Sequence, residues 1–191
     1  VNYTLMDKYM ITATVRHDGS SRFGADHKWG TFPSVSAAWR IGSEKFMEST
    51  RSWLDNLKLR VGYGVTGNQN GVDPYKSLSV LSSAGAAYYD ASTGTWKNSY
   101  VQAQNANPDL KWESTAQFNV GVDFGFLNRI NGSLEFYHKK TSDLLWTYPV
   151  PQPPYLVGTM LANVGDMVNK GVELTLGANI VRTKDFSLSA N

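Results

Sequence analysis

Hydrophobic and polar residues alternate with a period of two along much of the chain, which is typical of β-strands because successive side chains point to opposite faces. In the first clear stretch, Tyr9 and Ile11 share one face, while Thr12 lies on the other. The clear stretches are residues 9–16, 34–41, 57–65, 117–126 and 171–180. Weaker alternation at residues 130–140 and from about Phe186, together with Tyr3-Thr4-Leu5, brings the prediction to about eight strands.

Alternation by itself fits two kinds of all-β protein. In a β-sandwich the apolar face is a packed interior, whereas in a membrane barrel it faces lipid and the polar face lines the lumen. The apolar faces carry aromatic residues near strand ends, which fit the aromatic girdle of a membrane barrel as well as a sandwich core. These residues are Tyr9, Trp39, Phe124, Phe126 and Phe186.

The lengths of the connections favour the membrane barrel. Long connections at about residues 17–31, 66–111 and 145–168 alternate with tight turns at about 6–8, 127–129 and 183–185. Outer-membrane barrels have short periplasmic turns and long extracellular loops, whereas a sandwich has no reason to alternate in this way. The same assignment places all five aromatic residues at the periplasmic end.

One connection on the short side breaks this pattern. Residues 42–56 contain Glu44, Lys45, Phe46 and Trp53, which suggest a short amphipathic helical turn. Such a turn would cap the periplasmic rim, although an ordinary surface connector explains the segment equally well.

Composition narrows the possible functions. The net charge of +2 is small and evenly spread, so we expect no nucleic-acid partner. Cysteine is absent, which excludes disulfides and thiolate metal sites from this chain. No apolar run approaches the ~20 residues of a spanning helix, but a barrel strand needs only ~9–11. Because Val1 and Asn191 both fall inside strand-like sequence, we expect the chain to be an internal stretch of a larger barrel.

Several strings of residues, taken together and in order, resemble the SusC/RagA family of TonB-linked outer-membrane proteins of Bacteroidetes. They extend over nearly the whole chain, which makes them more specific than any single motif. The strings are Asp18-Gly19-Ser20-Ser21-Arg22-Phe23-Gly24, Trp29-Gly30-Thr31-Phe32-Pro33-Ser34, Tyr63-Gly64-Val65-Thr66-Gly67-Asn68-Gln69, Asn107-Pro108-Asp109-Leu110-Lys111-Trp112-Glu113, Lys140-Thr141-Ser142-Asp143-Leu144-Leu145 and Asn169-Lys170-Gly171-Val172-Glu173-Leu174.

The resemblance implies that residues 1–191 are part of an antiparallel, up-and-down transmembrane β-barrel of about 22 strands. It implies a nutrient importer in a Gram-negative outer membrane, in contact with lipid and with its own plug domain, through which TonB drives transport. It also implies a SusD-like surface lipoprotein that helps to capture an oligosaccharide or peptide. The resemblance points to no enzyme and no cofactor.

The side chains themselves suggest binding rather than catalysis. His17, His27 and the neighbouring aspartates match no metal-ligand spacing, and no serine triad or glycosidase carboxylate pair is recognisable, so we expect neither a metal nor catalytic residues. Aromatic rings in the connection at 66–111 can instead stack on sugars, contact a protein partner or pack the loop on itself. These candidate contact residues are Tyr75, Tyr88, Tyr89, Trp96 and Tyr100.

The polar faces carry two further features. Charged residues there fit a wet lumen in contact with a plug, because a packed interior would make them costly. They are Lys58, Arg60, Asp123, Glu135, Lys139 and Glu173. Glycines on the same faces indicate either strand curvature or the close approach of a plug. They are Gly62, Gly64, Gly121, Gly125, Gly171 and Gly177.

Two other interpretations remain open from the sequence. A soluble all-β carbohydrate-binding module would use the loop aromatics in a different way, with its apolar faces packed against each other. A complete small barrel is also conceivable, since eight strands can close; its first and last strands would then pair.

Overall fold

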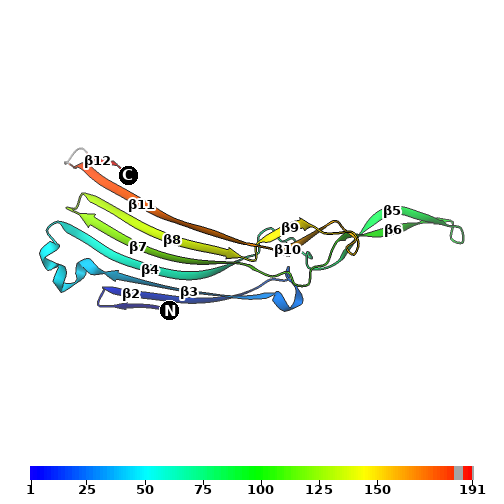
Figure 1. The fold of residues 1–191 in the computed structure, drawn as a ribbon, viewed down its shortest axis with the longest axis horizontal. Helices are drawn as coiled ribbons and strands as arrows, with labels where there is room; N and C mark the ends of the chain where they lie inside the picture. The colour runs from blue at the N-terminus through cyan, green and yellow to red at the C-terminus, as the bar shows by residue number, and fades with distance from the viewer. Residues whose placement is uncertain (183–186, 191) are drawn as a thin grey trace.

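The computed structural model describes residues 1–182 and 187–190. Eight strands form one antiparallel sheet in the order β1-β2-β3-β4-β7-β8-β11-β12, which confirms the predicted number of strands (Figure 1). Their bounds are β1 Asn2–Leu5, β2 Tyr9–Gly19, β3 Trp29–Arg40, β4 Leu54–Asn68, β7 Glu113–Phe126, β8 Ile130–Ser142, β11 Asp166–Arg182 and β12 Ser187–Ala190. Phe186, predicted as a girdle residue, and the turn expected at 183–185 lie outside the described residues.

The register of the sheet places apolar side chains side by side across six strands. One continuous row joins Tyr9, Trp39, Leu59, Val122, Leu134 and Leu174. The next row joins Ile11, Ala37, Val61, Val120, Phe136 and Val172. The sheet is a single layer, and large residues on this face, such as Ile11, Phe136 and Val172, remain 43–67% exposed (Figure 1). The apolar faces therefore do not pack against one another, as a β-sandwich requires.

Tight turns gather at one end of the sheet, as predicted (Figure 1). The β1–β2 turn places Met6 and Asp7 at φ of 52° and 54°, and the β7–β8 turn places Leu127 and Asn128 at 54° and 51°. Positive φ at both central residues defines the type I′ turn, whose twist matches that of the flanking strands.

The connection at 42–56 lies at the same end and is helical, as the amphipathic pattern suggested. It forms two 3₁₀ helices, η2 (Ile41–Ser43) and η3 (Lys45–Thr50), rather than one helical turn. Trp53 then stacks against Phe126 of β7, with 6.0 Å between ring centroids. The connector therefore packs an aromatic ring onto this rim of the sheet.

The long connections are more ordered than the sequence suggested. The connection at 66–111 folds into a hairpin of β5 (Val80–Asp90) and β6 (Thr95–Gln104), and that at 145–168 contains β9 (Leu145–Pro149) and β10 (Thr159–Asn163). Strand β11 begins at Asp166, earlier than predicted, and η1 (Ala25–His27) lies in the first long connection. Strands β5 and β6 escaped prediction because Gly, Ser and Asn interrupt their alternation and three register shifts disturb their pairing, whereas β9 and β10 are only five residues long.

The sheet is open. Strands β1 and β12 stand at its two margins, so the described residues do not form the small closed barrel. Over residues 1–182 and 187–190, no helix has the length and apolar character needed to cross a membrane.

Candidate functional site

The β5–β6 hairpin projects farther from the sheet than any other element and carries four of the five predicted contact residues (Figure 1). Tyr88 and Tyr89 lie on β5, whereas Trp96 and Tyr100 lie on β6. All four are between 53% and 65% exposed. In the part of the chain that the structure describes, these rings are therefore largely open to contact.

Three of these aromatic residues, Tyr89, Trp96 and Tyr100, lie on one face of the hairpin. Tyr89 lies opposite Trp96, and their rings meet edge to face with centroids 5.6 Å apart. Tyr100 follows four residues later on β6, so it shares the face of Trp96. Leu81, which lies opposite Gln102, extends this face and is 64% exposed. We call these four residues the aromatic face of the hairpin; Leu81 was not among the predicted contact residues.

The opposite face of the hairpin is more polar. Tyr88 lies there, opposite Lys97, whose ammonium is 3.7 Å from the Asp90 carboxylate. Hydrogen bonds from the Ser92 hydroxyl and, with a smaller effect, the Thr93 hydroxyl lower the pKa of Asp90. Tyr75 is not in the hairpin at all: its carbonyl accepts a hydrogen bond from Gln104 at 2.7 Å, and its exposed ring stands near the hairpin base. The structure thus unites three of the five predicted residues.

A small hydrophobic core holds the base of the long connections. Phe23, Val72 and Leu110 are at most 1% exposed, and each comes from a different segment of the loops or strand ends. Trp112 packs on this core, with its ring centroid 4.9 Å from that of Phe23. The strings around Phe23 and Leu110 that carry the family resemblance therefore meet in space. We call this cluster the loop core.

Asparagine side chains tie the hairpin base to β10 and its flanks. Asn105 donates to the Thr159 carbonyl at 3.0 Å and Asn107 to the Leu161 carbonyl at 2.8 Å. Asn163 accepts from the Lys111 amide at 2.9 Å and donates to the Lys111 carbonyl at 2.8 Å. These bonds replace a regular backbone ladder and satisfy backbone groups that would otherwise be costly to bury.

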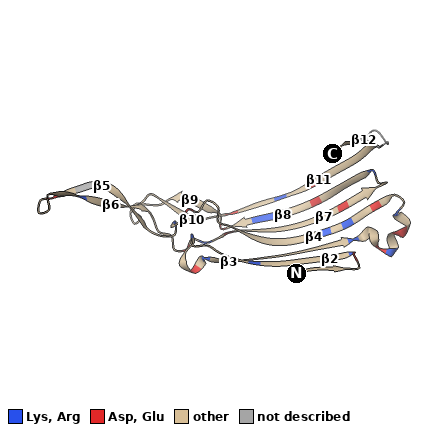
Figure 2. Ribbon diagram, turned by 180° about the vertical axis from the view of Figure 1, so that it is seen from behind, with Lys and Arg blue, Asp and Glu red and all other residues tan. Residues whose placement is uncertain are grey.

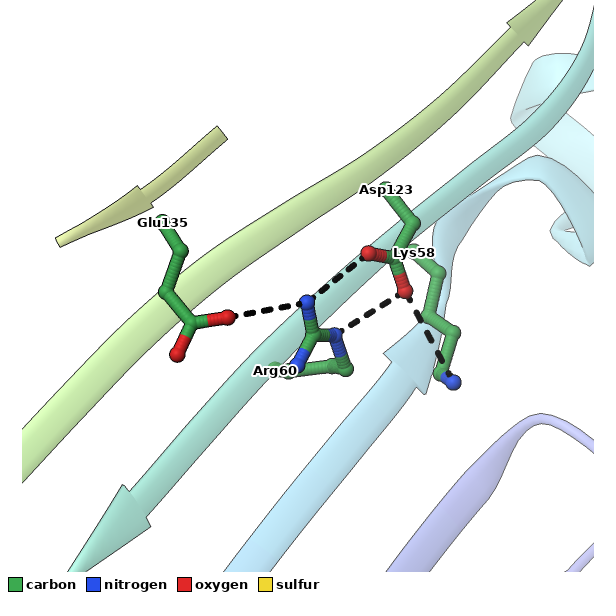
Figure 3. Close-up of polar contacts among 4 residues, drawn as sticks. All are labelled: Lys58, Arg60, Asp123 and Glu135. Atoms are coloured by element: carbon green, nitrogen blue, oxygen red, sulfur yellow. Dashed lines mark hydrogen bonds and ion pairs between the residues drawn. The ribbon is translucent and has the colours of Figure 1, made fainter. Parts of the chain in front are cut away.

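The polar face of the sheet carries an ion-pair cluster that joins β4, β7 and β8 (Figures 2 and 3). Arg60 binds Asp123 through two nitrogens at 2.9 and 3.0 Å and reaches Glu135 at 3.4 Å. Lys58 lies 3.8 Å from Asp123. Side chains of this cluster are 25–31% exposed, so they are partly wet. Four of the six predicted lumenal charges are thus paired with one another on one face.

Glycines on this face make room for neighbouring polar side chains, an explanation that neither sequence interpretation included. A Cβ on Gly62 would lie 2.6 Å from the Asn119 amide oxygen, and one on Gly121 would lie 3.0 Å from the Arg60 guanidinium. A Cβ on Gly171 would meet the Tyr137 hydroxyl at 2.8 Å. The side chains of Asn119, Arg60 and Tyr137 therefore lie across these glycines, close to the backbone of the sheet.

The apolar face ends in a rim of aromatic residues beside the tight turns. Tyr9 stacks on Trp39 with centroids 6.2 Å apart, and Phe124 lies 5.6 Å from Phe126. The Tyr9 hydroxyl and the Trp39 indole nitrogen both donate to Glu44, at 2.6 and 3.1 Å. Rings with one polar end suit the boundary between lipid and water.

His17 makes contacts within the loop region rather than belonging to the metal site considered from the sequence. The His17 ring stacks on Trp29 at 5.0 Å and contacts the Thr31 hydroxyl at 3.0 Å. Throughout residues 1–182 and 187–190, no three His, Asp or Glu side chains gather as a metal site would require.

Comparison with known proteins agrees with this geometry. The family description "TonB dependent receptor-like, beta-barrel" matches residues 1–191. The chain is 42% identical to the TonB-dependent receptor SusC of Bacteroides thetaiotaomicron over 98% of its own length and 18% of SusC. A TonB-dependent receptor of Formosa agariphila is 38% identical, over 98% of this chain and 17% of that protein.

Solved structures give the same result. The RagAB peptide importer in its closed-closed state superposes with a TM-score of 0.85 and 32% identity, over 98% of this chain and 20% of the importer chain. The chain thus spans about a fifth of the length of its relatives. Because the family description matches residues 1–191 and the chain is 42% identical to SusC over 98% of its length, the chain belongs to the TonB-dependent receptor β-barrel family, within its SusC/RagA group.

Proposed function

We propose that this chain forms wall and extracellular loops of an outer-membrane importer for oligosaccharides or peptides, and that it carries out no catalysis. One observation carries this proposal: a single-layer sheet exposes an apolar outer face while its other face bears the Arg60 cluster. The apolar face is suited to contact with lipid, and the face that carries the Arg60 cluster is suited to a water-filled lumen.

The rest of the importer would come from elements outside this chain. We infer a plug domain that TonB acts upon, and a SusD-like lipoprotein at the cell surface, as in the family that the chain belongs to. The RagAB complex, to which the chain is similar, is a peptide importer. For this protein both peptide and oligosaccharide remain within the proposal.

The aromatic face of the β5–β6 hairpin is our candidate surface for the lipoprotein or the substrate. Large aromatic side chains bury roughly 150–250 Å² each. Tyr89, Trp96 and Tyr100, with Leu81, could therefore supply much of the ~800 Å² that one partner contributes to a standard interface. Tyr and Trp are also the residues on which binding energy most often depends.

Substitution on the two faces of the hairpin tests this proposal. In the full-length importer with its lipoprotein, Trp96→Ala with Tyr100→Ala should lower lipoprotein co-purification and initial substrate uptake by about tenfold or more, the size expected for interface hot spots. Tyr88→Ala, on the opposite face, is the matched control and should leave both nearly unchanged. Equal effects of the two variants would contradict the assignment of the aromatic face.

A soluble carbohydrate-binding module was the alternative from the sequence, and membership of the TonB-dependent receptor β-barrel family speaks against it. It requires that the apolar outer face be covered or tolerate water. Fractionation of cells that express the full-length protein distinguishes the two: we expect the protein in detergent-extracted outer membranes. Recovery in the soluble fraction would favour the module and overturn the importer.

A further inference from the structure

Two basic side chains lie on the apolar face of the sheet, toward its loop end. His138 of β8 lies opposite Lys170 of β11 on one side and opposite Phe118 of β7 on the other. Across β4, β3 and β2 the same row continues as Tyr63, Val35 and Ala13. Basic segments of β8 and β11 lie side by side in Figure 2. One row of the outer face thus changes from apolar and aromatic residues to basic ones.

The positive charge of this row is not balanced within the described part of the chain. His138 and Lys170 are both exposed, and no carboxylate of residues 1–182 or 187–190 forms an ion pair with Lys170. Lys140, one row nearer the loops, differs because its ammonium lies 2.9 Å from the Asp166 carboxylate. That pair adds no net charge, so the local excess comes from Lys170, with the His138 ring as a second donor.

The apolar band on this face runs obliquely across the strands. On β2 it extends toward the loops as far as Val15, two rows beyond Ile11. On β8 and β11 the continuous run ends at Phe136 and Val172, which lie in the row of Ile11. Two rows are about 13 Å along a strand, and the five strand spacings from β2 to β11 are about 24 Å. The edge of the band therefore crosses the rows at roughly 30°, close to the ~35–45° at which barrel strands tilt in a membrane.

This tilt places the two basic side chains at the boundary of the lipid rather than within it. Because strands cross the membrane at an angle, residues of one row lie at different depths, and the row rises out of the apolar band at β8 and β11. A lysine on the lipid-facing side is costly at the midplane of a membrane but costs little near its interface. The apolar stem of Lys170 also allows its ammonium to reach the headgroup layer.

The chemistry of this edge is suited to a phosphate group. Side chains directly opposite each other on antiparallel strands have Cβ atoms about 4.5–5.5 Å apart. The Lys170 ammonium has three donors and the His138 ring has at least one, so both side chains can donate to the oxygens of a single phosphate. Phe136 and Val172 are the next opposed pair toward the tight turns. They offer an apolar surface to acyl chains that hang below such a phosphate.

We propose that Lys170 and His138 bind the phosphate of a lipid in the outer leaflet, whose acyl chains lie along Phe136 and Val172. This inference rests on the proposed outer-membrane location and adds a lipid ligand on the outer wall, apart from the imported substrate. A second copy of this chain is a poorer occupant, because a two-fold contact centred on this row would bring its like charges together.

Neighbouring residues on β8 and β11 provide a matched test in the full-length protein. The probe is monophosphoryl lipid A added to the protein in detergent, and native mass spectrometry measures its affinity. His138→Gln with Lys170→Gln should lower this affinity by about fivefold or more, as expected for a lysine beside an anionic lipid surface. Lys139→Gln removes a lysine from the adjacent position on the polar face and should leave the affinity nearly unchanged. Lys170→Arg should retain the affinity, since a guanidinium also binds phosphate.

The same lipid without its phosphate separates recognition of the headgroup from contacts with the acyl chains. It should bind more weakly than the phosphorylated lipid, and equally to the unsubstituted and the doubly substituted protein. Equal affinity for the two lipids, or an equal effect of Lys139→Gln, would overturn the phosphate site. Displacement of the lipid by inorganic phosphate would overturn the choice of a lipid as ligand, because it would show an anion site that needs no acyl chain.

Two further outcomes concern the setting of the site. A change of oligomeric state on double substitution would overturn the lipid site in favour of a second copy on this face. Recovery of the unsubstituted protein in the soluble fraction would overturn the proposed function itself. Import that proceeds normally in a protein that binds the two lipids alike would overturn only the lipid site.

Discussion

The Glu44 carboxylate accepts hydrogen bonds from the polar ends of Tyr9 and Trp39, two aromatic residues at the rim beside the tight turns. It also accepts from Lys8, and these hydrogen bonds, that of Tyr9 foremost, lower the pKa of Glu44 from 4.5 to about 2. Glu44 lies in the connector outside the spanning strands. The sequence suggested an amphipathic turn here but did not identify this contact, because the partners are separated from Glu44 by up to 36 residues.

This geometry predicts a defined pH dependence. Because the folded-state pKa is depressed, the Glu44 carboxylate stabilises the fold fully above about pH 4.5, and this contribution is lost as the pH falls toward 2. Thermal unfolding of the full-length protein should therefore show Glu44→Gln less stable at pH 7, with the difference closing between pH 4.5 and 2. A difference that is unchanged over this range would contradict the assignment.

Gly24 is a second residue whose role depends on a single close approach. A Cβ there would lie 1.7 Å from the Pro108 carbonyl oxygen, a backbone atom that cannot turn away. Gly24→Ala should loosen the loop core at a cost of about 1–3 kcal/mol, the usual range for overpacking. Limited proteolysis in outer membranes should then cut the long connections faster, while the strands stay protected.

Gly158→Ala is the control for this substitution. Its nearest neighbour would lie at 3.5 Å, an ordinary contact, so its proteolysis should match that of the unsubstituted protein. If both variants are cut alike, the close packing of Gly24 under Pro108 is not what orders the loops.

At the scale of strands, the Arg60 cluster couples three elements of the wall. Arg60 is on β4, Asp123 on β7 and Glu135 on β8, so the charges form ties across adjacent strands (Figure 3). A bidentate pair in a partly wet setting is stronger than an exposed ion pair, which contributes about 0–1 kcal/mol.

A double-mutant cycle measures this difference. Arg60→Ala and Asp123→Ala should couple by about 1–3 kcal/mol in unfolding of the full-length barrel, because the two residues share two hydrogen bonds. The control pair is Lys140 and Asp166, which also lie 2.9 Å apart but are each 50% exposed; its coupling should stay below about 1 kcal/mol. Equal couplings would show that the cluster is no more than a set of surface pairs.

At the scale of the molecule, the same introduced charge should destabilise the protein much more on one face of the sheet than on the other. Val61 lies in the apolar row that also contains Ala37, whereas Ser36, the neighbour of Ala37 on β3, points to the polar face. In lipid, Val61→Lys should cost about 2–4 kcal/mol and Ser36→Lys about 0–1 kcal/mol. Guanidinium unfolding of the full-length protein in vesicles measures both. Val61 is 37% exposed in the described sheet, so the two substitutions would have similar effects on unfolding if its face met water rather than lipid. That result would contradict the lipid-facing assignment.

The sequence alone determined the strands of the sheet, the face of each side chain and the end at which the tight turns gather. It could do so because the period of two is a local property of an extended chain, and register follows from keeping one face apolar across neighbours. The ordered strings also identified the family, which the comparisons confirm.

Only the tertiary structure decided which predicted contact residues act together. The hairpin register pairs Tyr89 with Trp96, which puts Tyr89 on the face of Trp96 and Tyr100 and puts Tyr88 on the opposite face, and this pairing is not visible in a periodic pattern. The loop core, the Glu44 contacts and the Arg60 cluster join residues far apart in sequence. Their existence depends on long-range packing and register, so no local pattern of hydrophobic and polar residues could have specified them.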